Sequence, residues 1–373
     1  MPVQISPRGF AGPPPPGREH SAPARARWLQ SRGRSLVIGL VNNMPDAALE
    51  STQRQFVELL DRASRDIAVE LRLFFLPDVP RGGAARLHLN QAYLGLDELW
   101  RSRLDGLIVT GTEPRAACLR DEPYWGSLTR VLEWAERHTT STIWSCLAAH
   151  AAVLHMDGVE RRTLGEKRFG VFACTNASPH PLLAGIADGI SIAHSRWNEL
   201  PQESLTSAGY TVLTRSIEAG VDTFVKPPTL PSPASGGGKG RGHQRSLFVF
   251  FQGHPEYDRR ALLREYRRDI GRFLRGERQT YPALPHGYFH AEAEDVLCAF
   301  RARAQRERSE SLLDGFPGSF LETRLAPVST EGVSRLYRNW LSYLCGGKRK
   351  AATLSEEAGH ARREDRAAAE RVV

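Results

Sequence analysis

Short apolar runs alternate with amphipathic stretches through the first half of the chain. Each apolar run is short and almost continuous, as in strands buried on both faces of a parallel sheet. The expected strands are residues 36–41, 67–76, 106–109 and 141–144. Between them, apolar side chains recur at helical spacing. The expected helices are 47–64, 96–103 and 124–138. This alternation predicts an α/β fold with a mostly parallel sheet flanked by helices.

The second half of the chain is richer in expected strands. These are residues 170–174, 190–194, 211–214 and 247–251. Two amphipathic helices are expected at 259–276 and 333–344. We therefore expect strand-rich additions to the parallel sheet.

Sequence composition divides the chain into a body and two tails. Residues 1–34 are rich in Pro and Arg without periodicity, which predicts disorder. One domain is expected over 35–345, interrupted by a low-complexity loop insertion at 226–245. Residues 346–373 read as a charged C-terminal tail.

The distribution of charge and cysteine excludes several classes of protein. The net charge of +8 places +5 in residues 1–34 and +2 in 346–373, so the body carries only +1 and is not an obvious nucleic-acid binder. No apolar run is long enough to span a membrane, and the N-terminus lacks the apolar segment of a secretory signal. Five scattered cysteines fit free thiols in the cytoplasm better than disulfides or a metal site.

Cys146 lies where the expected strand 141–144 meets a run of helix formers, residues 147–156. Strand, sharp turn and helix form a nucleophile elbow. The free amides at a helix N-terminus favour a thiolate and can hold the oxyanion of a tetrahedral intermediate. The alternative is that Cys146 is a small buried apolar residue, the usual fate of a free cysteine.

His254 and Glu256 are the best partners for a nucleophilic cysteine. They follow the expected strand 247–251, and residues two apart in extended chain point the same way. His254 would be the general base, and Glu256 would orient and stabilise its imidazole. An ordinary surface turn is the alternative.

With these residues in place, the chain resembles the homoserine O-succinyltransferase family, which has a class I glutamine-amidotransferase-like (flavodoxin-like) fold. The matching segments are Asn42-x-Met44-Pro45, Gly106-Leu-Ile-Val-Thr-Gly111, Tyr124-Trp125, Val131-Leu-Glu-Trp134, Thr140-Ser-Thr142, Cys146, Glu166-Lys167, His194-Ser195-Arg196, Gly253-His-Pro-Glu-Tyr-Asp258 with Glu265 and Arg268 behind it, and Asn339-Trp340-Leu341.

The resemblance implies ping-pong acyl transfer from an acyl-CoA to the hydroxyl of homoserine, in methionine biosynthesis. Cys146 would carry the acyl group as a thioester, and His254 and Glu256 would complete the triad. Lys167 and Ser195 match substrate-contacting positions of the family. Acyl-CoA would be a co-substrate, with no metal or other cofactor, and the family suggests a homodimer.

Arg268 matches the family arginine that holds the amino acid's carboxylate, a bidentate task suited to guanidinium. The alternative for Arg268 is a helix ion pair with Glu265.

Three departures from the family pattern bear on substrate choice. Asp46-Ala47 replaces a lysine pair, His150 replaces a glutamine, and Arg115 stands where the family has a small or acidic residue that sorts succinyl from acetyl donors. An arginine there could pair with a succinyl carboxylate, so we expect succinyl-CoA, with acetyl-CoA as the alternative. The departures leave serine or another hydroxy amino acid open as acceptor.

Two other classes of protein compete with this interpretation. A class I glutamine amidotransferase or related hydrolase would use the same triad, but the Gly-x-Cys-x-Gly elbow of those enzymes is absent, since Trp144-Ser145 and Leu147-Ala148 flank Cys146. A binding module with an inert cysteine is the non-enzymatic alternative.

Overall fold

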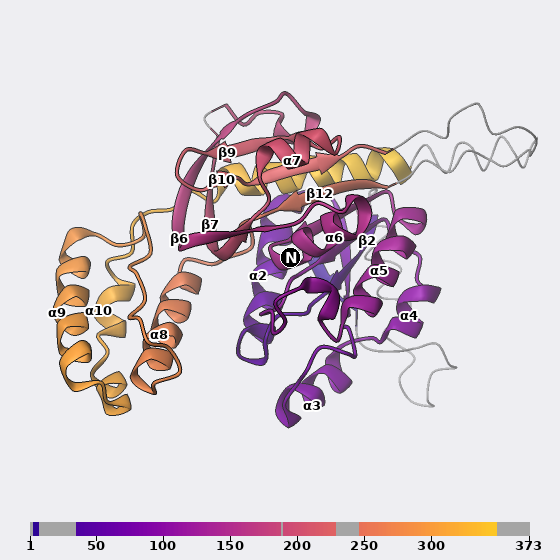
Figure 1. The fold of residues 1–373 in the computed structure, drawn as a ribbon. Helices are drawn as coiled ribbons and strands as arrows, with labels where there is room; N and C mark the ends of the chain where they lie inside the picture. The colour runs from indigo at the N-terminus through magenta and orange to yellow at the C-terminus, as the bar shows by residue number, and fades with distance from the viewer. Residues whose placement is uncertain (1–2, 7–34, 188, 229–245, 349–373) are drawn as a thin grey trace, which may run out of the picture.

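The computed structural model describes residues 3–6, 35–187, 189–228 and 246–348 (Figure 1). Its main sheet has eight strands in the order β1-β3-β2-β4-β5-β12-β11-β8. The strands are β1 Val3–Ile5, β2 Ser35–Val41, β3 Ala68–Phe74, β4 Gly106–Val109, β5 Ser141–Ser145, β8 Thr211–Val212, β11 Thr223–Lys226 and β12 Leu247–Phe251. Only the β12–β11–β8 edge is antiparallel.

The five central strands, β3-β2-β4-β5-β12, are parallel and follow the flavodoxin-like order. The predicted α/β fold with a mostly parallel sheet is therefore confirmed. In this order the C-terminal ends of β2, β4, β5 and β12 lie along one edge, where ligands bind in such sheets.

Alternate residues of each central strand face opposite layers of helices. In β2, Leu36, Ile38 and Leu40 join the core that contains α2 and the helix over residues 331–348, whereas Val41 joins the core under α5 and α6. This two-sided burial explains why the strands read as continuous apolar runs.

The helices match the amphipathic stretches where these were recognised. They are α2 Leu49–Ser64, α3 Gly83–Ala92, α4 Leu96–Arg101, α5 Trp125–His138, α6 Leu147–Asp157, α7 Gln202–Ser207, α8 Ala261–Leu274, α9 Ala291–Glu307 and α10 Gly318–Glu322. Short 3-10 turns are η1 Asp46–Ala48, η2 Leu119–Asp121, η3 Pro181–Leu183 and η4 Glu310–Gly315. None of the described helices combines the length and apolar character needed to cross a membrane.

The strand-rich addition is a four-stranded antiparallel sheet of order β10-β9-β6-β7. Its strands are β6 Arg162–Asn176, β7 Ile190–Glu199, β9 Thr214–Ser216 and β10 Gly220–Val221. A helical lobe, α8 to α10, lies to one side of the main sheet and has its own apolar core (Figure 1). Together, the long hairpin β6–β7 and the helical lobe face the carboxyl edge of the main sheet.

Three boundary predictions need correction. Lys226 is the last residue of β11 and pairs with Phe248, so it belongs to the sheet and not to the predicted insertion. Residues 3–5 form β1, which pairs with β3 through the register Val3↔Val69, so disorder was the wrong prediction for them. Residues 346–348 continue the last helix instead of starting a tail. The segment 3–5 is ordered because the apolar side chain of Val3 packs in the core. The remaining predictions for 7–34, 229–245 and 349–373 lie outside the described residues.

Candidate active site

Cys146 occupies a strained turn between β5 and α6. Its φ of 53° and ψ of −118° place a non-glycine residue in a conformation that is rarely populated. The Cys146 amide donates to the Phe251 carbonyl (2.8 Å), which ties the elbow to the end of β12. The side chain is partly exposed. The predicted strand–elbow–helix geometry is present, with Cys146 as the N-cap residue of α6.

The first turn of α6 has amides with no acceptor inside the helix. Gly111, in the loop after β4, packs directly against them: a Cβ there would lie 2.8 Å from the Leu147 nitrogen and 2.7 Å from the Leu147 Cβ. Any side chain at position 111 would therefore displace the loop from the helix N-terminus. The amides of Leu147 and Ala148, next to Cys146 at the start of α6, are the candidates for holding an oxyanion.

His254 links the cysteine to Glu256. The His254 Nδ1 lies 2.9 Å from Glu256 Oε1, the imidazole stacks on Tyr257 with centroids 4.2 Å apart, and the His254 amide donates to the Ala193 carbonyl (2.7 Å). Burial lowers the pKa of His254, but the nearby Cys146 thiolate and Glu256 carboxylate outweigh it and hold that pKa well above its usual value. The two anionic neighbours therefore favour the charged form of the His254 imidazole.

Cys146 and His254 open into one cavity of about 190 Å³ between the carboxyl edge of the sheet, the hairpin β6–β7 and α8. Lys167, Ser195 and Arg268 also line it. Five of the seven predicted site residues therefore line the same cavity. Glu256, the sixth, lies behind His254.

One side of this cavity, the paired wall, consists of Lys167, Glu265, Arg268 and Arg278, with Asp269 behind them. Lys167 Nζ lies 2.9 Å from Asp269 Oδ2 and 3.8 Å from Glu265 Oε2. Arg268 lies 2.9 Å from Asp269 and 3.5 Å from Glu265, so the helix ion pair considered from the sequence is present. Arg278 reaches Asp269 at 3.8 Å. Every cation of this wall therefore shares a carboxylate.

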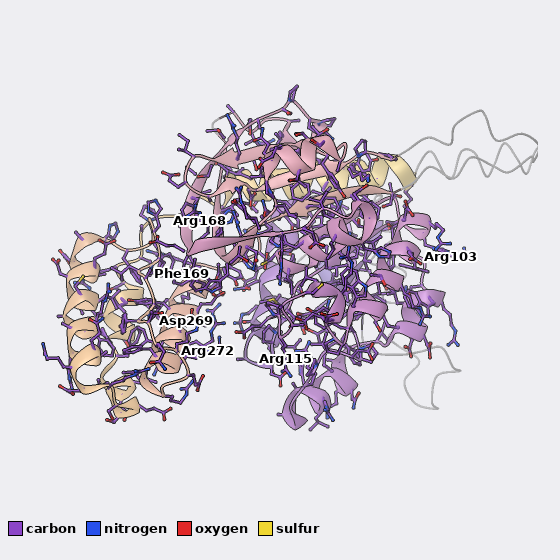
Figure 2. The ribbon with its side chains drawn as sticks, viewed as in Figure 1. Arg103, Arg115, Arg168, Phe169, Asp269 and Arg272 are labelled. Carbon is purple, nitrogen blue, oxygen red and sulfur yellow. The ribbon has the colours of Figure 1, made fainter. Side chains whose placement is uncertain are left out.

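Two hydroxyl groups add to the paired wall. Ser195 and Tyr257 both donate to the Glu265 carboxylate. Ser195 reaches α8 because β6 and β7 pair through Phe169↔Ser195, which also places Lys167 beside it. Figure 2 shows Asp269 on the helical lobe, toward Phe169 of β6.

Three other residues that line the cavity, His150, Arg161 and Arg196, form the unpaired wall. They lie near one another, since the charges of Arg196 and Arg161 both act on His150. Arg161 and Arg196 have no carboxylate within 4.0 Å among the described residues, although Glu122 lies near Arg161, and Glu199 and Asp222 near Arg196. Burial lowers the pKa of both guanidinium groups. This wall presents positive charge that the fold leaves without a close counter-ion.

His150 is held in one tautomer by Gln252. The Gln252 Oε1 accepts from the Leu200 amide (2.7 Å), and its Nε2 donates to the Val221 carbonyl (2.8 Å), which fixes the orientation of the amide. His150 Nε2, 3.1 Å from that same Oε1, must then be the donor. Burial, with help from Arg196 and Arg161, lowers the pKa of His150 to about 3, so the ring is neutral.

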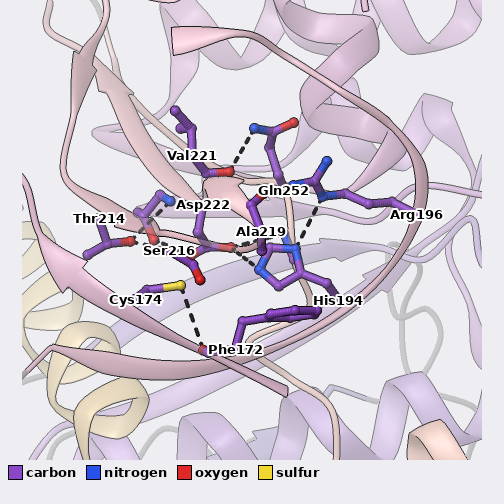
Figure 3. Close-up of polar contacts among 12 residues, drawn as sticks. Phe172, Cys174, His194, Arg196, Thr214, Ser216, Ala219, Val221, Asp222 and Gln252 are labelled. Atoms are coloured by element: carbon purple, nitrogen blue, oxygen red, sulfur yellow. Dashed lines mark hydrogen bonds and ion pairs between the residues drawn. The ribbon is translucent and has the colours of Figure 1, made fainter. Parts of the chain in front are cut away.

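A buried polar network behind the cavity supports the triad (Figure 3). The Asp222 carboxylate accepts from the Gly253 amide (3.0 Å) and the Thr223 hydroxyl (2.7 Å), and lies 3.3 Å from His194. On its other side, His194 accepts from Arg196 Nε (3.2 Å). Asp222 thus fixes the residue just before His254. Sequence reasoning did not find Asp222, because only the antiparallel edge strand β11 brings it there.

Arg115 lies elsewhere. Its side chain is exposed and is not among the residues that line the cavity. Its amide donates to Glu122 Oε1 (2.6 Å), and the Ala116 amide does the same (2.8 Å). Figure 2 shows Arg115 on the sheet side, across from Arg272 of α8. A donor-sorting role for Arg115 stays a prediction that this geometry does not support.

The described residues contain no group of three or more His, Cys, Asp or Glu side chains placed to hold a metal ion. The arrangement can perform nucleophilic acyl transfer with the side chains named above.

Comparison with known proteins gives the family. The model of the family "Homoserine O-succinyltransferase" matches residues 22–350. A homoserine O-succinyltransferase of Methylorubrum extorquens is 48% identical over 316 residues, covering 84% of this chain and 89% of that protein. One of Rhodopseudomonas palustris is 47% identical over 308 residues, covering 83% and 88%.

Among solved structures, a glutamine amidotransferase of Methylobacillus flagellatus has a TM-score of 0.41 at 14% identity, covering 83% of this chain and 94% of that one. That likeness is too distant to decide function. The extent of the family match and the level of identity to curated members are what decide the assignment, and this chain belongs to the homoserine O-succinyltransferase family of acyltransferases.

Proposed function

We propose that this protein transfers the succinyl group of succinyl-CoA to L-homoserine through a Cys146 thioester, as a step of methionine biosynthesis. The observation that carries the proposal is that Cys146 and His254 line a cavity with charged walls, with Glu256 paired to His254 behind it. A cytoplasmic location and a homodimer remain predictions.

In the first half-reaction, the Cys146 thiolate attacks the thioester carbonyl. The new bond joins Cys146 Sγ to the acyl carbon, and the carbonyl oxygen becomes an oxyanion that the Leu147 and Ala148 amides would stabilise. When the intermediate collapses, the carbon–sulfur bond to CoA breaks. The CoA sulfur leaves with the proton of the His254 imidazolium, so His254 becomes neutral.

In the second half-reaction, neutral His254 removes the proton of the homoserine hydroxyl. The hydroxyl oxygen attacks the acyl-Cys146 carbonyl, and collapse releases the ester and restores the thiolate–imidazolium pair. Glu256 keeps the Nδ1 proton in place and stabilises the imidazolium in both steps.

The paired wall suits the acceptor. Homoserine is a zwitterion, so its ammonium needs a carboxylate and its carboxylate needs a cation. Glu265 and Arg268, 3.5 Å apart and both lining the cavity, offer one of each. Lys167 and Ser195 supply further polar contacts on the same side.

Incubation with acyl-CoA alone tests the proposal. Intact-mass spectrometry should show a mass increase of one succinyl group, which Cys146→Ala abolishes and added homoserine discharges. Acetyl-CoA and serine, tested in parallel, should be poorer donor and acceptor. The same triad could instead hydrolyse glutamine; release of ammonia from glutamine, with no acyl adduct, would assign the protein to that class.

A further inference from the structure

The cations that line the cavity differ in whether the fold already neutralises them. Lys167, Arg268 and Arg278 each lie within 4.0 Å of a carboxylate. Arg161 does not, among the described residues; its one hydrogen bond runs from Nη2 to the Ala117 carbonyl (3.3 Å). Its Nη1 is buried and has no partner. A buried guanidinium nitrogen with an unmade bond is costly unless a ligand completes it.

Arg196, the other arginine of the unpaired wall, is committed to the fold. It is 4% exposed and donates to the Asn198 carbonyl (2.8 Å), the Ala219 carbonyl and His194. Arg196 therefore contributes positive charge, whereas Arg161 still has an N–H donor, on Nη1, without a hydrogen-bond partner. Both guanidinium groups are close enough to Cys146 for a thiolate there to raise their pKa.

The size of the cavity limits which anion Arg161 can meet. At about 190 Å³ it is smaller than the roughly 300–1,000 Å³ typical of drug-sized ligand sites, so the nucleotide of CoA must lie outside it. What enters is the acyl group carried by Cys146. A four-carbon dicarboxylic acyl chain bears its free carboxylate a few bonds from the thioester, within the same space.

We infer that Arg161 binds the free carboxylate of the acyl group and thereby selects a dicarboxylic acyl donor over a neutral one. This inference rests on the proposed function, because it concerns the group that Cys146 accepts. It assigns donor choice to the loop between α6 and β6 in place of Arg115. Guanidinium forms paired, charge-assisted hydrogen bonds with a carboxylate, and a neutral acyl chain would leave Arg161 unsatisfied.

Two donors that differ only at the chain end test the inference. Butyryl-CoA has the four carbons of succinyl-CoA with a methyl group in place of the carboxylate. In a ping-pong mechanism, kcat/KM for the donor reports the acylation half-reaction alone. We expect Arg161→Met to lower kcat/KM for succinyl-CoA by roughly 10- to 100-fold and to leave the butyryl-CoA value unchanged or higher. Arg161→Lys should recover part of the succinyl-CoA rate.

The matched control is Arg120→Met. Arg120 is exposed, pairs with Glu160 beside Arg161 (3.0 Å) and does not line the cavity, so its loss should not alter the donor ratio. Equal losses with both donors in Arg161→Met would overturn the inference. So would a selective loss of succinyl transfer in Arg115→Met without one in Arg161→Met.

The wild-type protein keeps the inference testable if the variants do not fold. It must prefer succinyl-CoA over butyryl-CoA at least tenfold; comparable rates would overturn the role of Arg161 and leave the Cys146 mechanism standing. Failure of either donor to acylate Cys146 would instead reject the proposed function itself.

Discussion

The two walls of the cavity handle positive charge in opposite ways. On the paired wall, burial lowers the pKa of Arg268, but Glu265 and Asp269 outweigh it and the net pKa is raised. On the unpaired wall, burial dominates, and the pKa values of Arg161 and Arg196 are lowered. A carboxylate within ion-pair distance is what separates the two outcomes.

The charges on each wall determine what that wall can bind. A wall with both signs of charge is suited to a zwitterion and attracts a simple anion only weakly, because its carboxylates repel the anion. A wall with positive charge alone is suited to an anion and would repel an ammonium group. The same cavity therefore offers one set of side chains suited to an amino acid and another suited to a dicarboxylic acyl group, as a two-substrate transferase requires.

The largest predicted effect removes the guanidinium of the paired wall. Arg268→Met should lower kcat/KM for homoserine about 100-fold, since a charge-assisted bond to a carboxylate contributes about 1.5–3 kcal/mol. Formation of the Cys146 acyl adduct from acyl-CoA alone should be unchanged. The control is Arg264→Met on the same helix, where Arg264 pairs with Asp258 (2.9 Å) away from the cavity. If Arg268→Met slowed formation of the acyl adduct as much as it lowered kcat/KM for homoserine, the two walls would not bind different substrates.

The next prediction concerns the neutral imidazole of the unpaired wall. The pKa of His150 is lowered to about 3 in the folded protein, against an ordinary value near 6.5. Between these values the unfolded chain binds a proton that the folded protein does not, so the stabilising contribution is present above pH 6.5 and is lost as pH falls.

At pH 5 the loss at His150 should be about 2 kcal/mol in the free energy of unfolding. Chemical denaturation at pH 7.5 and pH 5 should therefore show that the wild type loses about this much more than His150→Gln. The exposed His290 provides a control, and His290→Gln should follow the wild type. Parallel pH curves for wild type and His150→Gln would contradict a neutral, buried His150.

A smaller effect is expected from the carboxylate of the paired wall. Glu265→Gln removes the group that would meet the homoserine ammonium and leaves Lys167 and Arg268 with Asp269 alone. We expect KM for homoserine to rise about tenfold, equivalent to about 1.4 kcal/mol, with the donor ratio unchanged. Steady-state kinetics at saturating succinyl-CoA would measure it. An unchanged KM would place the ammonium elsewhere.

The smallest effect concerns an ion pair that joins α8 to the loop after β4. Arg272 of α8 forms a bidentate pair with Glu113 in the loop after β4, at 2.7 and 2.9 Å. Because Glu113 is about half exposed, the pair should contribute no more than about 1 kcal/mol to stability. A double-mutant cycle with Glu113→Gln and Arg272→Gln should return a coupling energy in that range, and it should shrink in high salt. A coupling of several kcal/mol would mean that the pair is a main support of the cavity.

Local sequence patterns were enough to predict the central strands, the elbow at Cys146 and the His254–Glu256 pair. The parallel pairing of β5 with β12, a long-range contact, brings the first of these site residues to the other two. Apolar runs gave the parallel strands, and the two-residue spacing from His254 to Glu256 placed both side chains on one side. The elbow at Cys146 needs only a strand, a turn and a helix in succession. The paired helix residues Glu265 and Arg268 were also within reach of spacing rules.

Long-range contacts decided the rest. Helices α3, α7, α9 and α10 were not predicted. Helix α9 shows why: its few buried residues pack within the helical lobe, so the 17-residue helix carries only a weak apolar stripe. The sequence also does not show which of the cavity's arginine and lysine side chains lie within ion-pair distance of a carboxylate. The sequence around Arg115 and around Arg161 does not show where either side chain ends. Only the folded chain places Arg115 at the surface and Arg161 in the cavity wall, because contacts between distant loops set their positions.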